Sequence, residues 1–308
     1  MFQHVLVPLD GSPMAEAALP AAARLAELLG AEVTLLHAVE RGAPETVHGE
    51  PHLASAEEAR AYLEGAAARA FPAGARTSTH VHRNEIADVA RSIAEHAGEL
   101  AGALIVMCTH GRGGLGNLLL GNIAQRVVEF GAAPVLLVPA GKPATMPAGK
   151  RRAARPFACG RLLAPLDGEQ EHERALPVAC ELARACGGSV RLLFAVPTRA
   201  TLSNGVGAAG RLLPGTASAM LEMAGQDAGA YLERIAGEVR AAGVEATTEV
   251  RRGDPADAIR TAARAWEADV IVMATHRRGG MQAFWEGSVA HRVASYARRP
   301  VLLVPVKD

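Results

Sequence analysis

The residues whose types and spacing could do chemistry follow two apolar segments in the first half of the chain. Asp10 and Gly11 come directly after one segment, and a loop bounded by Gly111 and Gly121 follows the other. If the segments are neighbouring strands of a parallel sheet, the carboxylate and the loop face one crevice. Glycines let backbone N–H groups approach a phosphate, and a helix N-terminus adds a positive dipole end. The pattern indicates a nucleotide site, although glycine is common at strand-to-helix turns.

These candidate residues lie in an internal duplication. Four blocks of sequence recur in the same order, at 4–11 and 161–168, 32–39 and 189–196, 103–110 and 269–276, and 135–139 and 301–305. Each block is a short run rich in Val, Ile and Leu, which is typical of strands buried on both faces of a parallel sheet. Helical patterns lie between the blocks, so the sequence predicts two tandem doubly wound α/β domains, each with a five-stranded parallel sheet.

We expect the domains at residues 1–140 and 159–308, joined by a solvated linker at 141–158 that is rich in Pro, Gly and basic residues.

Amphipathic patterns predict helices over Met14–Leu29, Ile86–His96 and Leu118–Phe130. Ser12 suits the N-cap of the first of them, because a proline follows it at the first helical position. The second copy holds nine more residues than the first, and its Gly/Ala/Ser-rich stretch Thr198–Ala219 is predicted to be a long loop.

The composition excludes several classes of partner. Lys+Arg and Asp+Glu both number 32, and aromatic residues make up only 4% of the chain. There is therefore no electrostatic or stacking reason to expect nucleic acid or an anionic membrane. No export signal and no apolar run long enough to span a membrane is present, which predicts a cytoplasmic protein. The four cysteines form no CxxC pair, and we expect them as reduced thiols.

The sequence motifs resemble the universal stress protein family over nearly the whole chain, twice. They are Pro-Leu-Asp-Gly-Ser from Pro8, Val-Met-x-Thr-His-Gly-Arg-Gly-Gly-Leu from Val106, Leu-Leu-Gly-x-Ile-Ala from Leu119 and Ala-Pro-Val-Leu-Leu-Val-Pro from Ala133. The resemblance implies strand order 3-2-1-4-5 in each domain. It also implies pairing of the domains through their fifth strands, Val135–Pro139 and Val301–Pro305, as a pseudo-twofold dimer within one chain. A homodimer of chains stays open.

Part of the family binds ATP through a Gly-x-x-Gly-x9-Gly-Ser/Thr motif, and this chain departs from it in both copies. In the first copy the four positions hold Cys108, Gly111, Gly121 and Asn122. In the second copy the four positions hold Ala274, Arg277, Gly287 and Ser288. The first copy keeps two glycines of three and the second keeps one, so the first is the better nucleotide candidate.

Our first hypothesis is therefore a non-enzymatic stress-response protein that binds ATP or ADP, with or without Mg²⁺, chiefly in the first domain. The predicted binding residues are Pro8, Leu9, Asp10, Ala38, Met107, His110, Gly111, Gly121, Asn122 and Ile123. The weaker second site comprises Pro165, Leu166, Asp167, Ala195, Met273, His276, Arg277, Gly287, Ser288 and Val289. The alternative is a nucleotide-free interaction scaffold with degenerate sites. A slow ATPase is the third and least favoured reading, because no P-loop, nucleophile elbow or HExxH motif is present.

Three residue types have two readings each. Asp10 could contact the ligand or serve the turn, and Cys108 could be a redox-responsive thiol or a buried core residue. His80 and His82 alternate on one face of a predicted strand, which would suit a metal pair. No third ligand is evident in the sequence, so we favour a solvent-facing edge and expect no metal site.

Overall fold

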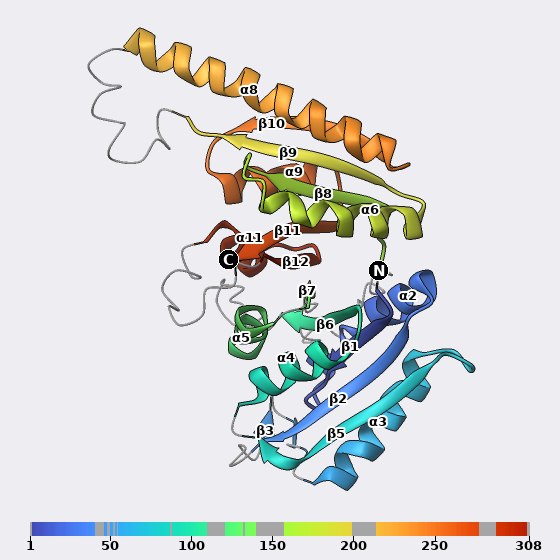
Figure 1. The fold of residues 1–308 in the computed structure, drawn as a ribbon. Helices are drawn as coiled ribbons and strands as arrows, with labels where there is room; N and C mark the ends of the chain where they lie inside the picture. The colour runs from blue at the N-terminus through green and yellow to red at the C-terminus, as the bar shows by residue number, and fades with distance from the viewer. Residues whose placement is uncertain are drawn as a thin grey trace, which may run out of the picture.

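The structure, a computed structural model, describes residues 2–40, 46–47, 50–51, 53, 55–86, 88–109, 121–131, 133–139, 157–198, 214–276 and 288–306. One ten-stranded sheet runs through the molecule in the order β10-β9-β8-β11-β12-β7-β6-β1-β2-β5 (Figure 1). Its strands in the first half are β1 (His4–Pro8), β2 (Glu32–Glu40), β5 (Thr77–Ile86), β6 (Ala103–Thr109) and β7 (Val135–Pro139). Those in the second half are β8 (Arg161–Leu166), β9 (Ser189–Val196), β10 (Glu245–Arg252), β11 (Val270–His276) and β12 (Val301–Val306).

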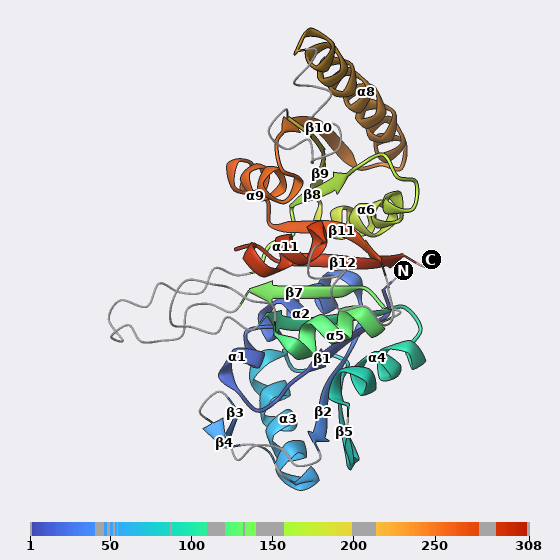
Figure 2. The same ribbon diagram turned by 90° about the vertical axis from the view of Figure 1, so that its left-hand side faces the viewer.

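Each half repeats the strand order 3-2-1-4-5 with all neighbours parallel, which confirms the predicted fold. The halves meet where β7 and β12 pair antiparallel (Figure 2). Leu136 lies opposite Leu302 in this ladder. These two leucines are equivalent positions of the repeat, so the local twofold axis passes between them and the predicted pairing of the fifth strands is confirmed.

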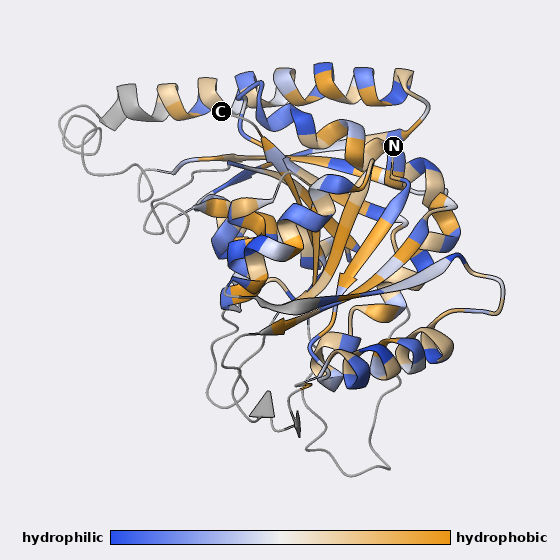
Figure 3. Ribbon diagram, turned by 60° about the horizontal axis from the view of Figure 1, so that its bottom comes forward, coloured by the Kyte–Doolittle hydropathy of each residue, from blue (hydrophilic) through white to orange (hydrophobic). Residues whose placement is uncertain are grey.

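Helices cover both faces of the sheet and enclose two apolar cores, each of which continues across both halves. One face carries α2 (Leu19–Leu29), α3 (Ala56–Ala70), α6 (Ala175–Cys186) and α8 (Pro214–Ala241). The other carries α4 (Val89–Glu99), α5 (Asn122–Phe130), α9 (Pro255–Ala265) and α11 (Val289–Tyr296). The strands between them are predominantly hydrophobic (Figure 3), as expected for a parallel sheet buried on both faces. A short antiparallel pair, β3 (Thr46–Val47) and β4 (Glu50–Pro51), lies outside this sheet.

The predicted helix Met14–Leu29 is two helices, α1 (Pro13–Glu16) and α2. Ser12 caps α1 as predicted, since its side chain accepts a hydrogen bond from the backbone N–H of Ala15 at 3.2 Å. The chain then makes a tighter turn at Ala17 and Ala18, because Pro20 has no N–H and its ring clashes with the preceding turn.

Two other expected boundaries were wrong. Ile86 ends strand β5, and the next helix begins only at Val89, because the carboxylate of Asp88 accepts from the N–H of Arg91 and caps it. Residues 214–219 of the expected loop belong to α8, which has 28 residues where α3, its counterpart, has 15. The second copy therefore uses part of its extra length to lengthen a helix.

The expectation of four reduced thiols was also wrong. Cys159 and Cys186 form a disulfide between the segment before β8 and the end of α6, while Cys108 and Cys180 are free and buried. The two bonded residues are 27 positions apart, but the fold brings their Cα atoms to 5.8 Å, within the usual range for a disulfide.

The domain boundaries stay a prediction, since residues 140–156, nearly all of the expected linker, lie outside the described residues. In the part of the chain that the structure describes, none of the helices combines the length and apolarity needed to span a membrane.

Candidate ligand-binding site

The first-half candidate residues lie where β1, β2 and β6 end. Pro8 closes β1 beside β2, and β6 pairs with β1 on its other side, so Asp10, Ala38 and Met107 come to one edge of the sheet. Gly121, Asn122 and Ile123 begin α5. His110 and Gly111, the remaining members of the predicted set, lie outside the described residues.

Asp10 has a structural role in this half. Its Oδ1 accepts hydrogen bonds from the N–H and the hydroxyl of Ser12, at 2.9 and 2.6 Å. Ser12 in turn caps α1, so the aspartate fixes the turn that follows β1. The neighbouring Leu9 carbonyl accepts from Nδ1 of buried His37 at 2.8 Å, which determines the protonated nitrogen of that ring. The described contacts therefore support the turn role of Asp10 and leave a ligand contact open.

Cys108 is buried at the end of β6, and burial followed by the charge of Asp10 raises the pKa of its thiol to about 12. A thiol that stays protonated near neutral pH is a poor nucleophile. The structure thus favours the interpretation of Cys108 as a buried core residue.

One ion pair fixes the helix that starts at the candidate phosphate loop, and it occurs in both halves. Arg126 of α5 donates to Asp88, the N-cap of α4, at 2.6 Å. At the equivalent positions Arg292 of α11 donates two hydrogen bonds to Asp254, the N-cap of α9, at 2.7 and 2.8 Å. Sequence analysis missed these pairs, although both members recur at the same spacing in the repeat.

The second half holds a pocket of about 370 Å³ at the carboxyl ends of β8, β9 and β11. Eight of the ten residues predicted for the second site line it: Pro165, Leu166, Asp167, Ala195, Met273, His276, Ser288 and Val289. Arg277 and Gly287, the other two, lie outside the described residues. Glu129 of α5 also lines the pocket, so residues from both halves contribute to it.

A chain of polar side chains crosses this pocket. Nδ1 of His172 lies 2.8 Å from both carboxylate oxygens of Asp167, and its Nε2 lies 2.8 Å from Nε2 of His276. The hydrogen bond to Asp167 raises the pKa of His172, against the opposing effect of burial. Burial raises the pKa of Asp167, but its hydrogen bonds from His172 and the Glu169 backbone outweigh this, so the pKa lies below its usual value.

The raised pKa favours the protonated form of His172 in the pocket, and sequence analysis missed this residue. It belongs to a short 3₁₀ turn, η2 (His172–Arg174), and Ala15 occupies the equivalent position in the first copy. No repeat pattern could therefore have identified it.

Two further pocket residues, Thr275 and Ser288, carry hydroxyls that differ in their hydrogen bonding. Oγ1 of Thr275 is buried and has no hydrogen-bond partner among the residues that the structure describes. Ser288 caps α11 by accepting from the N–H of His291 at 3.1 Å. The pocket therefore combines apolar walls with an imidazole whose raised pKa favours the cationic form and with a helix N-terminus, a set that can hold an anionic ligand with an apolar part.

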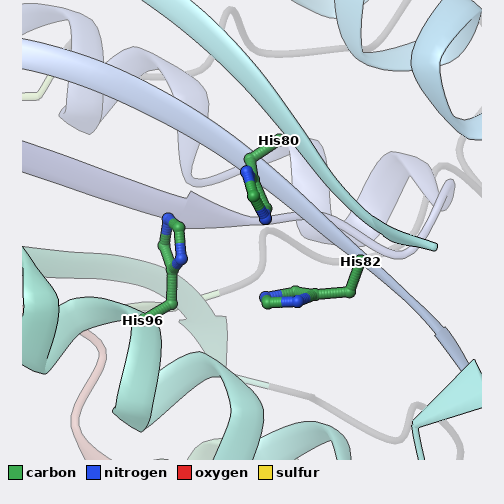
Figure 4. A group of neighbouring side chains, drawn as sticks. All are labelled: His80, His82 and His96. Atoms are coloured by element: carbon green, nitrogen blue, oxygen red, sulfur yellow. The ribbon is translucent and has the colours of Figure 1, made fainter. Parts of the chain in front are cut away.

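A second group of side chains lies outside this pocket. His80 and His82 of β5 meet His96 of α4, and the ligand atoms of the three lie within 4.8 Å of one another (Figure 4). A third imidazole thus lies beside the histidine pair, which the sequence pattern did not show, because the packing of α4 against the sheet brings His96 there.

The comparison with known proteins identifies the family. The model of the universal stress protein family matches the chain twice, at residues 1–139 and 159–305. The chain belongs to the universal stress protein family.

Relatives of this universal stress protein match either the whole chain or about half of it. A universal stress protein of Mycolicibacterium smegmatis is 27% identical over 310 residues, covering 97% of this chain and 96% of its own. One from Thermus aquaticus is 38% identical over 143 residues, covering 45% of this chain and 99% of its own. The relatives thus match either the whole duplication or one copy.

Solved structures show the same tandem fold. A universal stress protein from Archaeoglobus fulgidus superposes with a TM-score of 0.63 at 18% identity, covering 99% of this chain and 97% of its own. A functionally unknown protein from Pseudomonas aeruginosa gives a TM-score of 0.66 at 19% identity, with 99% and 93% coverage. At these identities the likeness concerns the fold of this universal stress protein.

Proposed function

We propose that this universal stress protein is a non-enzymatic stress-response protein that binds an adenine nucleotide, ATP or ADP, with or without Mg²⁺, where its strands end. The observation that carries the proposal is the second-half pocket, which is lined by residues that the sequence alone assigned to a nucleotide site. Its volume of about 370 Å³ falls within the range of small-molecule sites, about 300–1,000 Å³.

The chemistry of the lining supports a nucleotide. Leu166, Ala195 and Met273 offer apolar contacts for a base. The cationic ring of His172 and the N-terminus of α11 favour a phosphate. In this half the proposal therefore relies on the imidazole of His172 and the N-terminus of α11, because the first two glycines of the motif are replaced by Ala274 and Arg277.

The first half remains a candidate on the strength of its glycines. Gly121 begins α5 without a side-chain cap, so the first N–H groups of the helix have no acceptor from a capping side chain. Gly111 precedes it in the sequence, and a glycine-bearing loop ahead of a helix N-terminus is a common way to bind phosphate. We propose binding in either half, with the glycine route in the first and the histidine route in the second.

Calorimetric titration of the nucleotide-stripped chain with ATP and Mg²⁺ tests this proposal. Ala195→Trp fills the second pocket and Gly121→Trp obstructs the first, while Ala241→Trp on an exposed turn of α8 serves as the control. Saturable heat that one site variant removes or reduces, and the control retains, assigns the half. Absence of saturable heat in the wild type, or heat that survives in the double variant, overturns the proposal.

A nucleotide-free scaffold is the second candidate, and two contacts favour it. Ser288 already caps α11, and the carboxylate of Asp167 is already bonded to His172, so these polar groups are satisfied without a ligand. Mass spectrometry of freshly purified protein separates the two candidates, because a scaffold releases no nucleotide on denaturation. A steady release of inorganic phosphate from ATP that exceeds the buffer rate would instead support the slow ATPase.

A further inference from the structure

Three histidines meet on one face of the first half, between β5 and α4, and His82 lies beside Ala38 near the end of β2. The ring centroids of His80 and His96 lie 4.5 Å apart, those of His80 and His82 4.8 Å, and those of His82 and His96 5.6 Å. Figure 4 shows the rings of the two β5 residues and the α4 residue pointing into one space. No two of their ligand nitrogens are more than 4.8 Å apart.

Histidine side chains are unusual on this face of the sheet. β5 is the edge strand of the sheet, and His80 and His82 lie opposite Leu36 and Ala38 of β2. Leu36 is buried in the core beneath α4, so the neighbouring strand fills this face with apolar residues. On β5 the same face carries imidazoles instead. Burying these polar rings costs free energy unless their nitrogens have a polar partner.

One ring nitrogen of the cluster is available to an ion. Neutral imidazoles have a free lone pair, which is the form that binds a metal ion. Nε2 of His82 is buried without a hydrogen-bond partner in the described part of the chain.

A carboxylate lies behind one of the rings. Oε2 of Glu99 is 3.7 Å from Nδ1 of His96, one helical turn along α4. Metal-binding histidines commonly have a carboxylate at the nitrogen that does not bind the ion, where it orients the ring. The separation of 3.7 Å is longer than a hydrogen bond, so Glu99 must approach further to orient the ring.

We propose that His80, His82 and His96 bind one divalent transition-metal ion of the zinc type, with a water molecule in the fourth position. Three imidazole donors without thiolate or carboxylate ligands suit Zn²⁺, Co²⁺ or Ni²⁺, whereas Mg²⁺ and Ca²⁺ prefer oxygen. Zinc–nitrogen bonds of about 2.0–2.1 Å in a tetrahedron place donors about 3.3 Å apart. The most distant donors must therefore approach by about 1.5 Å, which side-chain rotation at exposed His80 and half-exposed His82 allows.

The ion would join the edge strand to the helix that covers it. β5 has no neighbour on its outer side in the described sheet, so a bond from its two histidines to α4 holds this edge in place. Because metal binds the folded form, saturation stabilises the protein by mass action. At an ion concentration of about 100 times Kd, we expect the Tm to rise by about 4 °C.

The test uses the full chain, without a histidine tag, treated with chelator and then titrated with ZnCl₂ alone. Atomic absorption after dialysis should find one zinc per chain, and thermal unfolding should show the rise in Tm. His96→Gln and His80→Asn should each lower the zinc affinity at least about tenfold and remove the Tm response, as loss of one ligand of three does. His4→Gln, a histidine at the start of β1, is the matched control and should leave both unchanged.

His80 is exposed, so His80→Asn keeps the test valid if His96→Gln fails to fold. A cobalt-loaded sample adds a spectroscopic check, since Co²⁺ in a four-coordinate site of three histidines gives d–d bands that the His80→Asn variant should lose. Substoichiometric zinc in the wild type, or zinc and Tm responses that the ligand variants retain, would overturn the proposal.

Discussion

Replacing Leu136 by alanine tests whether β7 and β12 join the two halves into one folding unit. Leu136 is 2% exposed and lies opposite Leu302, which is fully buried, at the local twofold axis. Removing a buried leucine side chain costs about 3–5 kcal/mol, from lost transfer free energy and the cavity left behind. With a urea m value of about 3 kcal/mol/M for a chain of this size, the unfolding midpoint should fall by about 1–1.7 M.

The two tryptophans make the assay specific. Trp266 and Trp285 both lie in the second half, so tryptophan fluorescence reports only that half, while far-UV circular dichroism reports both. If the ladder couples the halves, the substitution in the first half shifts both signals by the same amount. A fluorescence midpoint that stays at the wild-type value, with dichroism splitting into two steps, would refute the coupling.

Leu25→Ala is the matched control. Leu25 is 1% exposed in α2, in the core of the same half but away from the β7–β12 ladder. Equal fluorescence shifts for both variants mean that the whole chain unfolds in one transition. A shift for Leu136→Ala alone means that the strand ladder itself carries the coupling.

Three further substitutions test individual contacts. Asp254→Ala removes the N-cap of α9 together with the bidentate partner of an arginine in α11, and should lower the free energy of unfolding by about 2 kcal/mol in urea titrations. Asp257→Ala, at an exposed carboxylate of the same helix, should cost less than half as much. The hydrogen bond to Asp167 raises the pKa of His172. The stabilisation that this bond gives is therefore complete below pH 6.5, the ordinary pKa of histidine, and disappears as the pH rises through the raised pKa. His172→Gln should therefore cost up to about 1 kcal/mol more at pH 6 than at pH 9, and an equal cost at both would count against the ion pair. Reducing the Cys159–Cys186 disulfide, whose residues are 27 positions apart, should lower the free energy of unfolding by about 3–4 kcal/mol, and Cys159→Ser should remove the response to dithiothreitol.

The sequence predicted the features that depend on neighbouring residues or on repetition. The recurring runs of Val, Ile and Leu located the strands, because a strand buried on both faces needs an apolar residue at nearly every position. Ser12 followed by proline located the start of α1, since a cap is a contact within one turn of chain. The repeat and the strand ends also located the second-site residues, and eight of them line one pocket.

Sequence patterns also misplaced elements where two local signals conflict. The apolar periodicity over Met14–Leu29 continues through Pro20, so periodicity alone predicts one helix. The missing N–H of proline overrides it, and the chain forms two.

Only the tertiary structure decided which distant residues meet. The disulfide of Cys159 requires that α6 end beside the start of β8, and the third histidine, His96, requires that α4 pack over the edge strand. His172 enters the pocket on a turn that the first copy does not share, so the duplication could not reveal its contact with Asp167. Sequence patterns record how each segment satisfies its own backbone and buries its own face. Contacts between side chains from separate segments depend on how the packed helices are positioned and rotated against the sheet, which no single segment encodes.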